Sequence, residues 1–163
     1  MKKNYKIALV QMKSSTIKSE NLKLSVDYIR QAAKKKVELV CFPEFQMAYS
    51  PPEQTAKELS AISENAINRN FISTLRKEAK KHKINVIATI YENMDIERKK
   101  KNDYRVSDTA IIISNRGEEL SIYRKLHLYD ALGFKESTKL IGGDKIESPV
   151  KVGIGKIGLM VCY

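Results

Sequence analysis

Along the first third of the chain, the spacing of hydrophobic residues changes from that of a strand to that of a helix and then to a short apolar run. Residues 6–12 alternate and are rich in Ile, Ala and Val, which predicts a strand. Apolar residues then recur at helical spacing from Leu22 to Ala33, after capping residues at 19–21. A short apolar run at 37–42 predicts a second, buried strand. Strand, helix and strand in this order form a βαβ unit.

The alternation resumes after the break at Ser50-Pro51-Pro52. Apolar residues from Phe71 to Ala79 predict another helix, and residues 85–91 predict a third strand. This order of elements favours an α/β fold.

Two hairpins follow in the second half of the chain. Residues 108–114 and 120–125 flank Asn115-Arg116-Gly117, a turn signature with glycine. Two more strand candidates, 149–154 and 156–162, surround a glycine near the end. No repeat, low-complexity segment or long linker divides the sequence, so we expect one domain over residues 1–163.

Charge adds one alternative function. The chain of 163 residues has 30 Lys and Arg against 19 Asp and Glu, a net charge of +11. The cations cluster at residues 34–36, 80–83 and 98–101, at predicted helix ends or a hairpin tip. Cations there offset helix dipoles or are hydrated. No aromatic residue is interleaved for base stacking, so a solvated surface is favoured over a nucleic-acid-binding module.

Cysteine usage and the apolar segments indicate the compartment. Cys41 and Cys162 form no CxxC pair, which excludes a disulfide scaffold and argues against a structural zinc site. The apolar run at 7–10 is shorter than a secretory core, and no segment approaches the length of a transmembrane helix. We predict a cytoplasmic protein with no membrane partner.

Three reactive residues stand at predicted strand ends, where open α/β sheets place binding crevices. They are Glu44, Lys125 and Cys162. Each has an ordinary explanation alone: a cap, one cation among many, and a small core residue. Together they combine a thiol nucleophile, a carboxylate base and a cation for a developing oxyanion.

Histidine offers a second possible base. His127 lies two residues beyond Lys125 and could share its strand face, so a Cys162–His127 dyad is an alternative. Otherwise we expect a packed, hydrogen-bonded imidazole, and we expect Cys41 in the core.

Four segments carry a resemblance to a known family. They are IALVQM at 7–12, FPEF at 42–45, YRKLHLYD at 123–130 and GLMVCY at 158–163. In this order they resemble the nitrilase or carbon-nitrogen hydrolase superfamily, whose members use a Glu-Lys-Cys triad. The resemblance extends over essentially the whole chain.

The resemblance implies an αββα four-layer sandwich and a role for each site residue. Glu44 would be the general base, Lys125 the oxyanion-binding cation, and Cys162 the nucleophile that forms a thioester or thioimidate. Glu136 matches the family's additional glutamate near the site, which helps to position the attack, although a solvated loop carboxylate remains its alternative. The backbone N–H of Tyr163 would be a second oxyanion donor.

The implied substrate is a small, linear, non-peptide amide, an N-carbamoyl amine or a nitrile, cleaved without a cofactor or metal. An amidase is favoured over a nitrilase, because residues 124–130 look most like the branch with omega-amidases and deaminated-glutathione amidases. The resemblance also implies a homo-oligomer.

The chain departs from the family pattern at its end. It stops at Tyr163, whereas the resembling enzymes continue into a second half of comparable size. A terminal carboxylate beside Cys162 would disfavour both the thiolate and the oxyanion. We therefore expect a fragment or a truncated product that is inactive or nearly so alone. The alternative function is a non-catalytic fragment or pseudoenzyme that acts only with a partner chain.

Overall fold

A computed structural model describes residues 4–65, 68–93 and 102–162. Its main feature is a mixed five-stranded sheet in which the strands follow their order in the sequence. The first three strands are parallel and the last two are antiparallel. The strands are β1 (Ile7–Leu9), β2 (Leu39–Cys41), β3 (Asn85–Glu92), β4 (Ser107–Ile113) and β5 (Glu119–Arg124).

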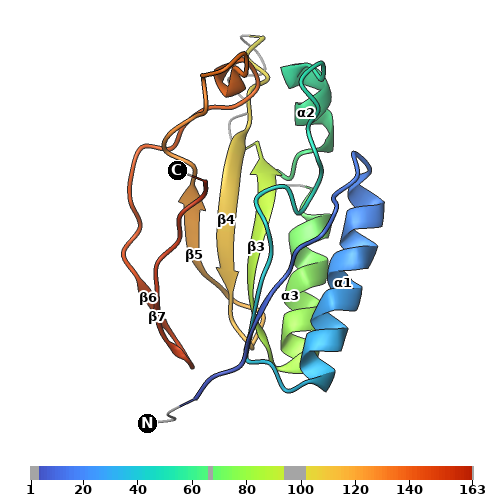
Figure 1. The fold of residues 1–163 in the computed structure, drawn as a ribbon, viewed down its shortest axis with the longest axis vertical. Helices are drawn as coiled ribbons and strands as arrows, with labels where there is room; N and C mark the ends of the chain where they lie inside the picture. Colours follow the sequence, from blue (N-terminus) through green and yellow to red (C-terminus); the bar gives the residue numbers. More distant parts are fainter. Residues whose placement is uncertain (1–3, 66–67, 94–101, 163) are drawn as a thin grey trace.

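Two long helices cover one face of this sheet (Figure 1). They are α1 (Lys18–Lys34) and α3 (Asn70–His82). The shorter helix α2 (Ala56–Ile62) lies near the carboxyl end of β3, and a 3₁₀ turn covers Glu136–Thr138. Apolar residues at helical spacing on α1 and α3 pack against alternate residues of β3 and β4, which forms the larger core.

The opposite face of the sheet has a smaller core. A hairpin of β6 (Val150–Val152) and β7 (Gly155–Ile157) lies on this side with the segment that follows it. Leu159 and Val161 of that segment pack with residues of β4 and β5. Of the four layers that the resemblance implies, the described residues form one layer of helices and one sheet, and a short apolar segment covers part of the other face of that sheet.

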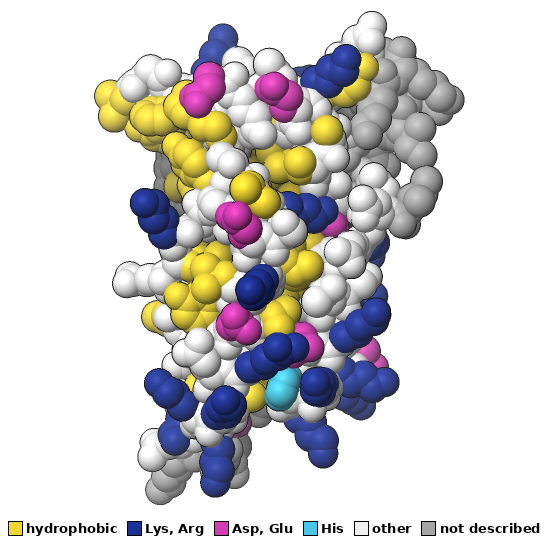
Figure 2. Space-filling model, turned by 90° about the vertical axis from the view of Figure 1, so that its right-hand side faces the viewer, with side chains coloured by type: hydrophobic (Ala, Val, Ile, Leu, Met, Phe, Trp, Pro, Cys, Tyr) yellow, Lys and Arg dark blue, Asp and Glu magenta, His cyan; other side chains and the backbone are white. Residues whose placement is uncertain are grey.

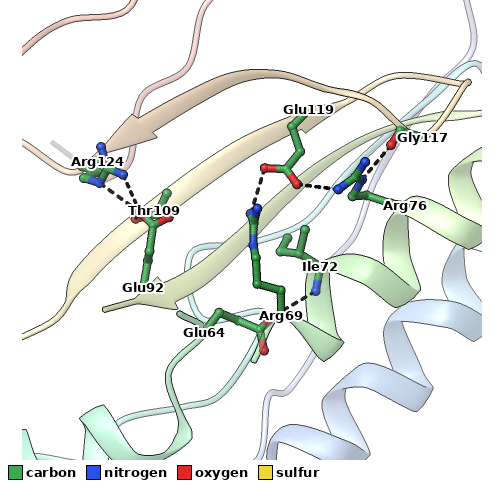
Figure 3. Close-up of polar contacts among 9 residues, drawn as sticks. All are labelled: Glu64, Arg69, Ile72, Arg76, Glu92, Thr109, Gly117, Glu119 and Arg124. Atoms are coloured by element: carbon green, nitrogen blue, oxygen red, sulfur yellow. Dashed lines mark hydrogen bonds and ion pairs between the residues drawn. The ribbon is translucent and has the colours of Figure 1, made fainter. Parts of the chain in front are cut away.

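Ion pairs tie α3 to the sheet (Figure 3). Glu119 of β5 accepts hydrogen bonds from Arg69 at 2.8 Å and Arg76 at 3.2 Å. Arg76 also donates to the carbonyl of Gly117 at 2.7 Å. Gly117 has φ of 80°, and a Cβ there would meet the Arg76 carbonyl at 2.7 Å, so this turn requires glycine.

The prediction of α/β alternation is confirmed, with differences at particular elements. Helix α2 was not predicted, although Thr55 and Glu58 form a capping box at its start. Residues 19–21 do not cap α1, which begins at Lys18 without a side-chain cap. Instead Asn21 and Ser15 bond each other, which ties the preceding loop to the helix.

The last predicted strand is shorter than expected. It ends at Ile157, and residues 158–162 belong to no strand ladder in the described chain. Burial still alternates along this segment, which is what an edge strand without a neighbour shows. The predicted basic tip at 98–101 lies outside the described residues.

The other basic clusters lie where the sequence places them. Figure 2 shows Lys and Arg gathered toward the end of the molecule where α1 and α3 finish. The last turns contain Lys34 in α1 and Lys80, Lys81 and His82 in α3. Across the described part of the chain, every helix is too short or too polar to cross a lipid bilayer.

Candidate functional site

Glu44 lies in a tight turn that follows β2. The turn closes through the N–H of Gln46, which donates to the Pro43 carbonyl at 3.1 Å. The Gln46 side chain is fully buried, accepts from the Thr89 N–H at 2.9 Å and donates to Ser25 at 3.1 Å. These bonds anchor the turn to β3 and α1 and so fix the backbone that carries Glu44.

Lys125 follows the last residue of β5. Its N–H donates to the Asp108 carbonyl at 2.8 Å, and its carbonyl accepts from the Gly143 N–H at 2.9 Å. A Cβ on Gly143 would meet the Arg124 carbonyl at 2.6 Å, so only glycine allows this close approach. The Lys125 side chain is 1% exposed.

The Lys125 ammonium joins two glutamates from distant parts of the chain. It lies 2.7 Å from Glu44 Oε1, and 3.0 Å and 2.9 Å from the two oxygens of Glu136. Glu136 also accepts from the Tyr129 N–H at 2.7 Å. Each glutamate is about one-fifth exposed, at 21% and 20%. We call Glu44, Lys125 and Glu136 the lysine cluster.

Electrostatics keep this lysine charged. Burial alone would lower the pKa of Lys125, but hydrogen bonds to Glu44 and Glu136, together with their charges, outweigh burial and raise that pKa. A fixed ammonium in a dry site can stabilise a developing oxyanion. The cluster therefore offers both a cation and a nearby carboxylate base.

Cys162 is not joined to the lysine cluster. Its thiol is exposed, and within the described chain no hydrogen bond links it to Glu44 or Lys125. Its φ of 58° lies in the left-handed region, which is uncommon for cysteine. Val161 packs in the same apolar cluster as Tyr123 and Leu126, so the segment lies beside β5 near Lys125.

Three other expectations have mixed outcomes. The packed ring expected for His127 is wrong, because His127 is exposed. Cys41 is half-buried, and burial raises the pKa of its thiol, which disfavours the thiolate. Tyr163 lies outside the described residues, so the position of its N–H stays a prediction.

Two adjoining pockets open beside the cluster. One of about 520 Å³ is lined by Glu44, and the other, of about 550 Å³, by Glu136. They share Phe45 and Tyr49, whose rings meet edge to face with centroids 6.0 Å apart. Volumes of this size suit small organic molecules. Within residues 4–65, 68–93 and 102–162, no group of three or more His, Cys, Asp or Glu is arranged for a metal ion.

Comparison with known proteins decides the family. The model of the family described as carbon-nitrogen hydrolase matches residues 6–163. The chain belongs to the carbon-nitrogen hydrolase family.

Curated relatives agree with this carbon-nitrogen hydrolase assignment. The chain is 29% identical to nitrilase homolog 2 of Dictyostelium discoideum, over 99% of this chain and 47% of the relative. It is 27% identical to the deaminated glutathione amidase of Escherichia coli O157:H7, over 96% of this chain and 56% of the relative. The chain thus spans about half the length of the curated relatives it matches.

Solved structures confirm the fold of this carbon-nitrogen hydrolase chain. The NitFhit protein of C. elegans superposes with a TM-score of 0.82 at 26% identity, over 96% of this chain and 37% of that protein. An amidase from Nesterenkonia sp. superposes with a TM-score of 0.73 at 24% identity, over 98% of this chain and 56% of that amidase. A mixed sheet with helices on one face is thus the shared architecture.

Sequence reasoning missed three residues that shape the candidate site. Gln46 and Gly143 hold the backbone of Glu44 and Lys125, and Asp108 is buried beside them. The Gly142-Gly143 pair was a usable signal, because adjacent glycines mark a close backbone approach. Nothing in the local pattern distinguishes Gln46 or Asp108 from surface polar residues.

Proposed function

We propose that this chain carries the Glu-Lys-Cys site of an amidase. Glu44 is the general base, Lys125 binds the oxyanion, Cys162 is the nucleophile and Glu136 positions Lys125. The observation that supports this most directly is the buried ammonium of Lys125 held between two glutamates at 2.7 and 2.9 Å. A cation, a base and a thiol are the groups that thioester chemistry requires.

In the proposed acylation, Glu44 takes the thiol proton while Cys162 Sγ forms a bond to the substrate carbonyl carbon. The carbonyl oxygen gains the negative charge and is stabilised by Lys125 and by the N–H of Tyr163. The intermediate collapses as the carbon–nitrogen bond breaks, and Glu44 returns the proton to the leaving nitrogen. Ammonia or an amine leaves, and a thioester remains.

In the proposed deacylation, water is the nucleophile and the Cys162 thiolate is the leaving group. Glu44 takes a proton from water, the hydroxide adds to the thioester carbon, and Lys125 again stabilises the oxyanion. The carbon–sulfur bond breaks, the carboxylic acid leaves, and the proton returns to Cys162. The nitrogen product and the acid together balance one amide and one water.

The proposed substrate is a small, linear, non-peptide amide. The two pockets of about 520 and 550 Å³ and their aromatic walls support a small organic acyl group. Omega-amides are the first class to test, with N-carbamoyl amines and nitriles next. We place the reaction in the cytoplasm, without a cofactor.

We propose that the 163-residue chain alone is inactive or nearly so. Cys162 is exposed and not bonded to the lysine cluster, and residues 158–162 lack a strand partner in the described chain. Activity would require the other layers of the αββα sandwich that the resemblance implies. The resemblance also supports a homo-oligomer. These added layers would hold the thiol against Glu44 and Lys125.

The test compares the protein made from its own gene in its own cells with the recombinant 163-residue chain. Ammonia release is measured for omega-amides and N-carbamoyl amines. We expect release by the native protein, its loss in Cys162→Ala and Glu44→Gln, and little release by the recombinant chain. Unchanged release in Cys162→Ala would contradict the proposed nucleophile.

A non-catalytic role is the second candidate, because the Cys162 thiol is exposed and, in the part of the chain that the structure describes, not hydrogen-bonded to the lysine cluster. A fragment of this kind would act only with a partner chain that covers its sheet. It predicts no amide turnover by the native protein but a stable complex in size-exclusion chromatography. Turnover that depends on Cys162 would exclude this candidate.

A further inference from the structure

Asp108 is a buried carboxyl group without a role in the mechanism above. It is the second residue of β4 and pairs with Tyr91 of β3, while its carbonyl accepts the N–H of Lys125 at 2.8 Å. The strand register places the side chains of Tyr91 and Asp108 on the same face of the sheet, and the hydrogen bond from Lys125 places that residue beside Asp108 on the side of the neighbouring strand. Asp108 is 1% exposed.

No donor reaches this carboxyl within the described chain. Both side-chain oxygens of Asp108 are buried and lack a hydrogen-bond donor. Glu44, which accepts from Lys125 at 2.7 Å, is a neighbouring carboxyl group that raises the pKa of Asp108 through its charge and a side-chain hydrogen bond, and as a carboxylate Glu44 is itself an acceptor. Two carboxyl groups can bond each other only if one of them carries a proton.

The charge balance also requires a proton here. Lys125 already bonds Glu44 and Glu136, so a charged Asp108 would make three anions around one cation. The neighbouring Arg124 is engaged with Glu92 at 2.9 Å (Figure 3). A third charge without a partner in a buried site is costly, and the group neutralises instead.

Burial and the neighbouring carboxylates raise the pKa of Asp108, and one neighbour lowers it. Burial raises its pKa most, followed by the charge of Glu44, a hydrogen bond with Glu44, and the charge of Glu136. Only Lys125 opposes the rise in the pKa of Asp108. The buried Tyr91 on the paired strand also has a raised pKa, first through burial and then through Asp108, Glu44 and Glu136. Its phenol therefore stays neutral.

We propose that Asp108 is a protonated positioning residue that donates its carboxyl proton to Glu44. The two carboxyl groups share this proton, which holds the Glu44 side chain toward Lys125. This inference rests on the proposed role of Glu44 as base. A base fixed by two donors keeps one geometry through both proton transfers.

The first test needs no catalysis. In the protein labelled with ¹³C at aspartate side-chain carboxyl carbons, the resonance lost in Asp108→Asn is assigned to Asp108 and followed from pH 4 to 9. We expect it to keep the shift of a protonated acid at pH 7. A resonance that titrates in the ordinary aspartate range, or that is ionised at pH 7, would overturn the proposal.

The second test uses the pH dependence of stability. Since the pKa of Asp108 is raised by folding, its contribution to stability is greatest below the unfolded pKa and declines as pH rises toward the folded pKa. Asp108→Asn should therefore gain melting temperature relative to the unmutated protein between pH 4 and 8. A growing loss over that window would contradict a protonated Asp108.

Asp130 provides the matched control for the stability test. Its exposed carboxylate accepts from the side chain and the N–H of Ser137, and these bonds lower its pKa. Because this pKa is lowered, the contribution of Asp130 to stability is complete above the unfolded pKa and is lost as pH falls through the folded pKa. The stability difference for Asp130→Asn should therefore change below about pH 4 and stay nearly constant from pH 4 to 8, where that of Asp108→Asn should change.

A third test applies to the active protein. Asp108→Asn keeps a donor for Glu44, so the acidic limb of the kcat/KM profile should keep its position. Asp108→Ala removes the donor and should move that limb to higher pH, because the charged form of Glu44 is less stabilised. Equal loss in both variants would overturn the proposal. Inactivity of all proteins, with the ¹³C result unchanged, would contradict the proposed amidase function and not the shared proton.

Discussion

The two halves of the proposed triad differ in how firmly this chain holds them. The lysine cluster joins the turn after β2, the end of β5 and the 3₁₀ turn through bonds of 2.7 to 3.0 Å to a lysine that is 1% exposed. Cys162 ends an extended segment with an exposed thiol and a left-handed φ. Hydrogen bonds hold the lysine cluster in place, whereas the described chain provides none between this cluster and Cys162.

This difference has a structural cause. β2, which precedes Glu44, lies between β1 and β3, and β5, which precedes Lys125, is paired with β4. Among the described residues, 158–162 join no strand ladder, and Leu159 and Val161 pack in the smaller core. A preorganised charge site can therefore form before the nucleophile is positioned, and closure of the segment would complete the site.

The largest expected effect comes from removing the cation at the centre of the cluster. Lys125→Met leaves Glu44 and Glu136 without their shared partner, so we expect a loss of about 3–5 kcal/mol in the free energy of unfolding. Urea denaturation measures it. Lys151→Met, at an exposed position of β6, is the control and should change stability by less than about 0.5 kcal/mol. Equal effects would mean that the cluster is not held as described.

The next effect concerns the backbone that carries the lysine. Gly143→Ala places a Cβ 2.6 Å from the Arg124 carbonyl, so the backbone must move, and we expect a loss of about 1–3 kcal/mol. Gly153→Ala meets no atom within 4 Å and is the matched control. A crystal structure of Gly143→Ala should show Lys125 displaced from Glu136. An unchanged melting temperature would argue against the close approach.

Thiol reactivity measures the other half of the comparison. Cys162 is exposed, whereas Cys41 is half-buried with a thiol pKa raised by burial. Iodoacetamide at pH 7 should alkylate Cys162 faster than Cys41, because the Cys41 thiol is less accessible and its raised pKa leaves less of it as thiolate. Peptide mass spectrometry over time gives both rates. Faster labelling of Cys41 would mean that residues 158–162 are covered in solution.

The smallest effect is expected at the nucleophile itself. Cys162→Ala removes an exposed side chain that bonds nothing in the described chain, so stability should change by less than about 0.5 kcal/mol. Thermal unfolding of the 163-residue chain measures this change. A loss as large as that of Gly143→Ala would show that the thiol is already packed against the site.

The sequence predicts local elements well where one physical signal dominates. The hairpin around Gly117, the helix from Phe71 to Ala79 and the strand that became β3 follow directly from periodicity and turn chemistry. The predicted final strand, 156–162, is too long. Alternation at 158–162 indicates that one face of the segment is buried, but it does not indicate that a neighbouring strand pairs with it.

The site was predictable only in part. The motifs named Glu44, Lys125 and Glu136, and the structure brings these three together. Asp108 could not be found from the sequence, because its burial depends on three strands that meet through tertiary packing. Such long-range contacts leave no periodic signal.

The most direct measurement of the central claim is the intact mass of the native protein after acid quenching during amide turnover. The unmutated protein should carry an acyl adduct on Cys162, and Glu44→Gln should carry less of it, because acylation needs Glu44 to take the thiol proton. Cys162→Ala should show no adduct. An adduct on another residue, or amide turnover that persists in Cys162→Ala, would contradict the account.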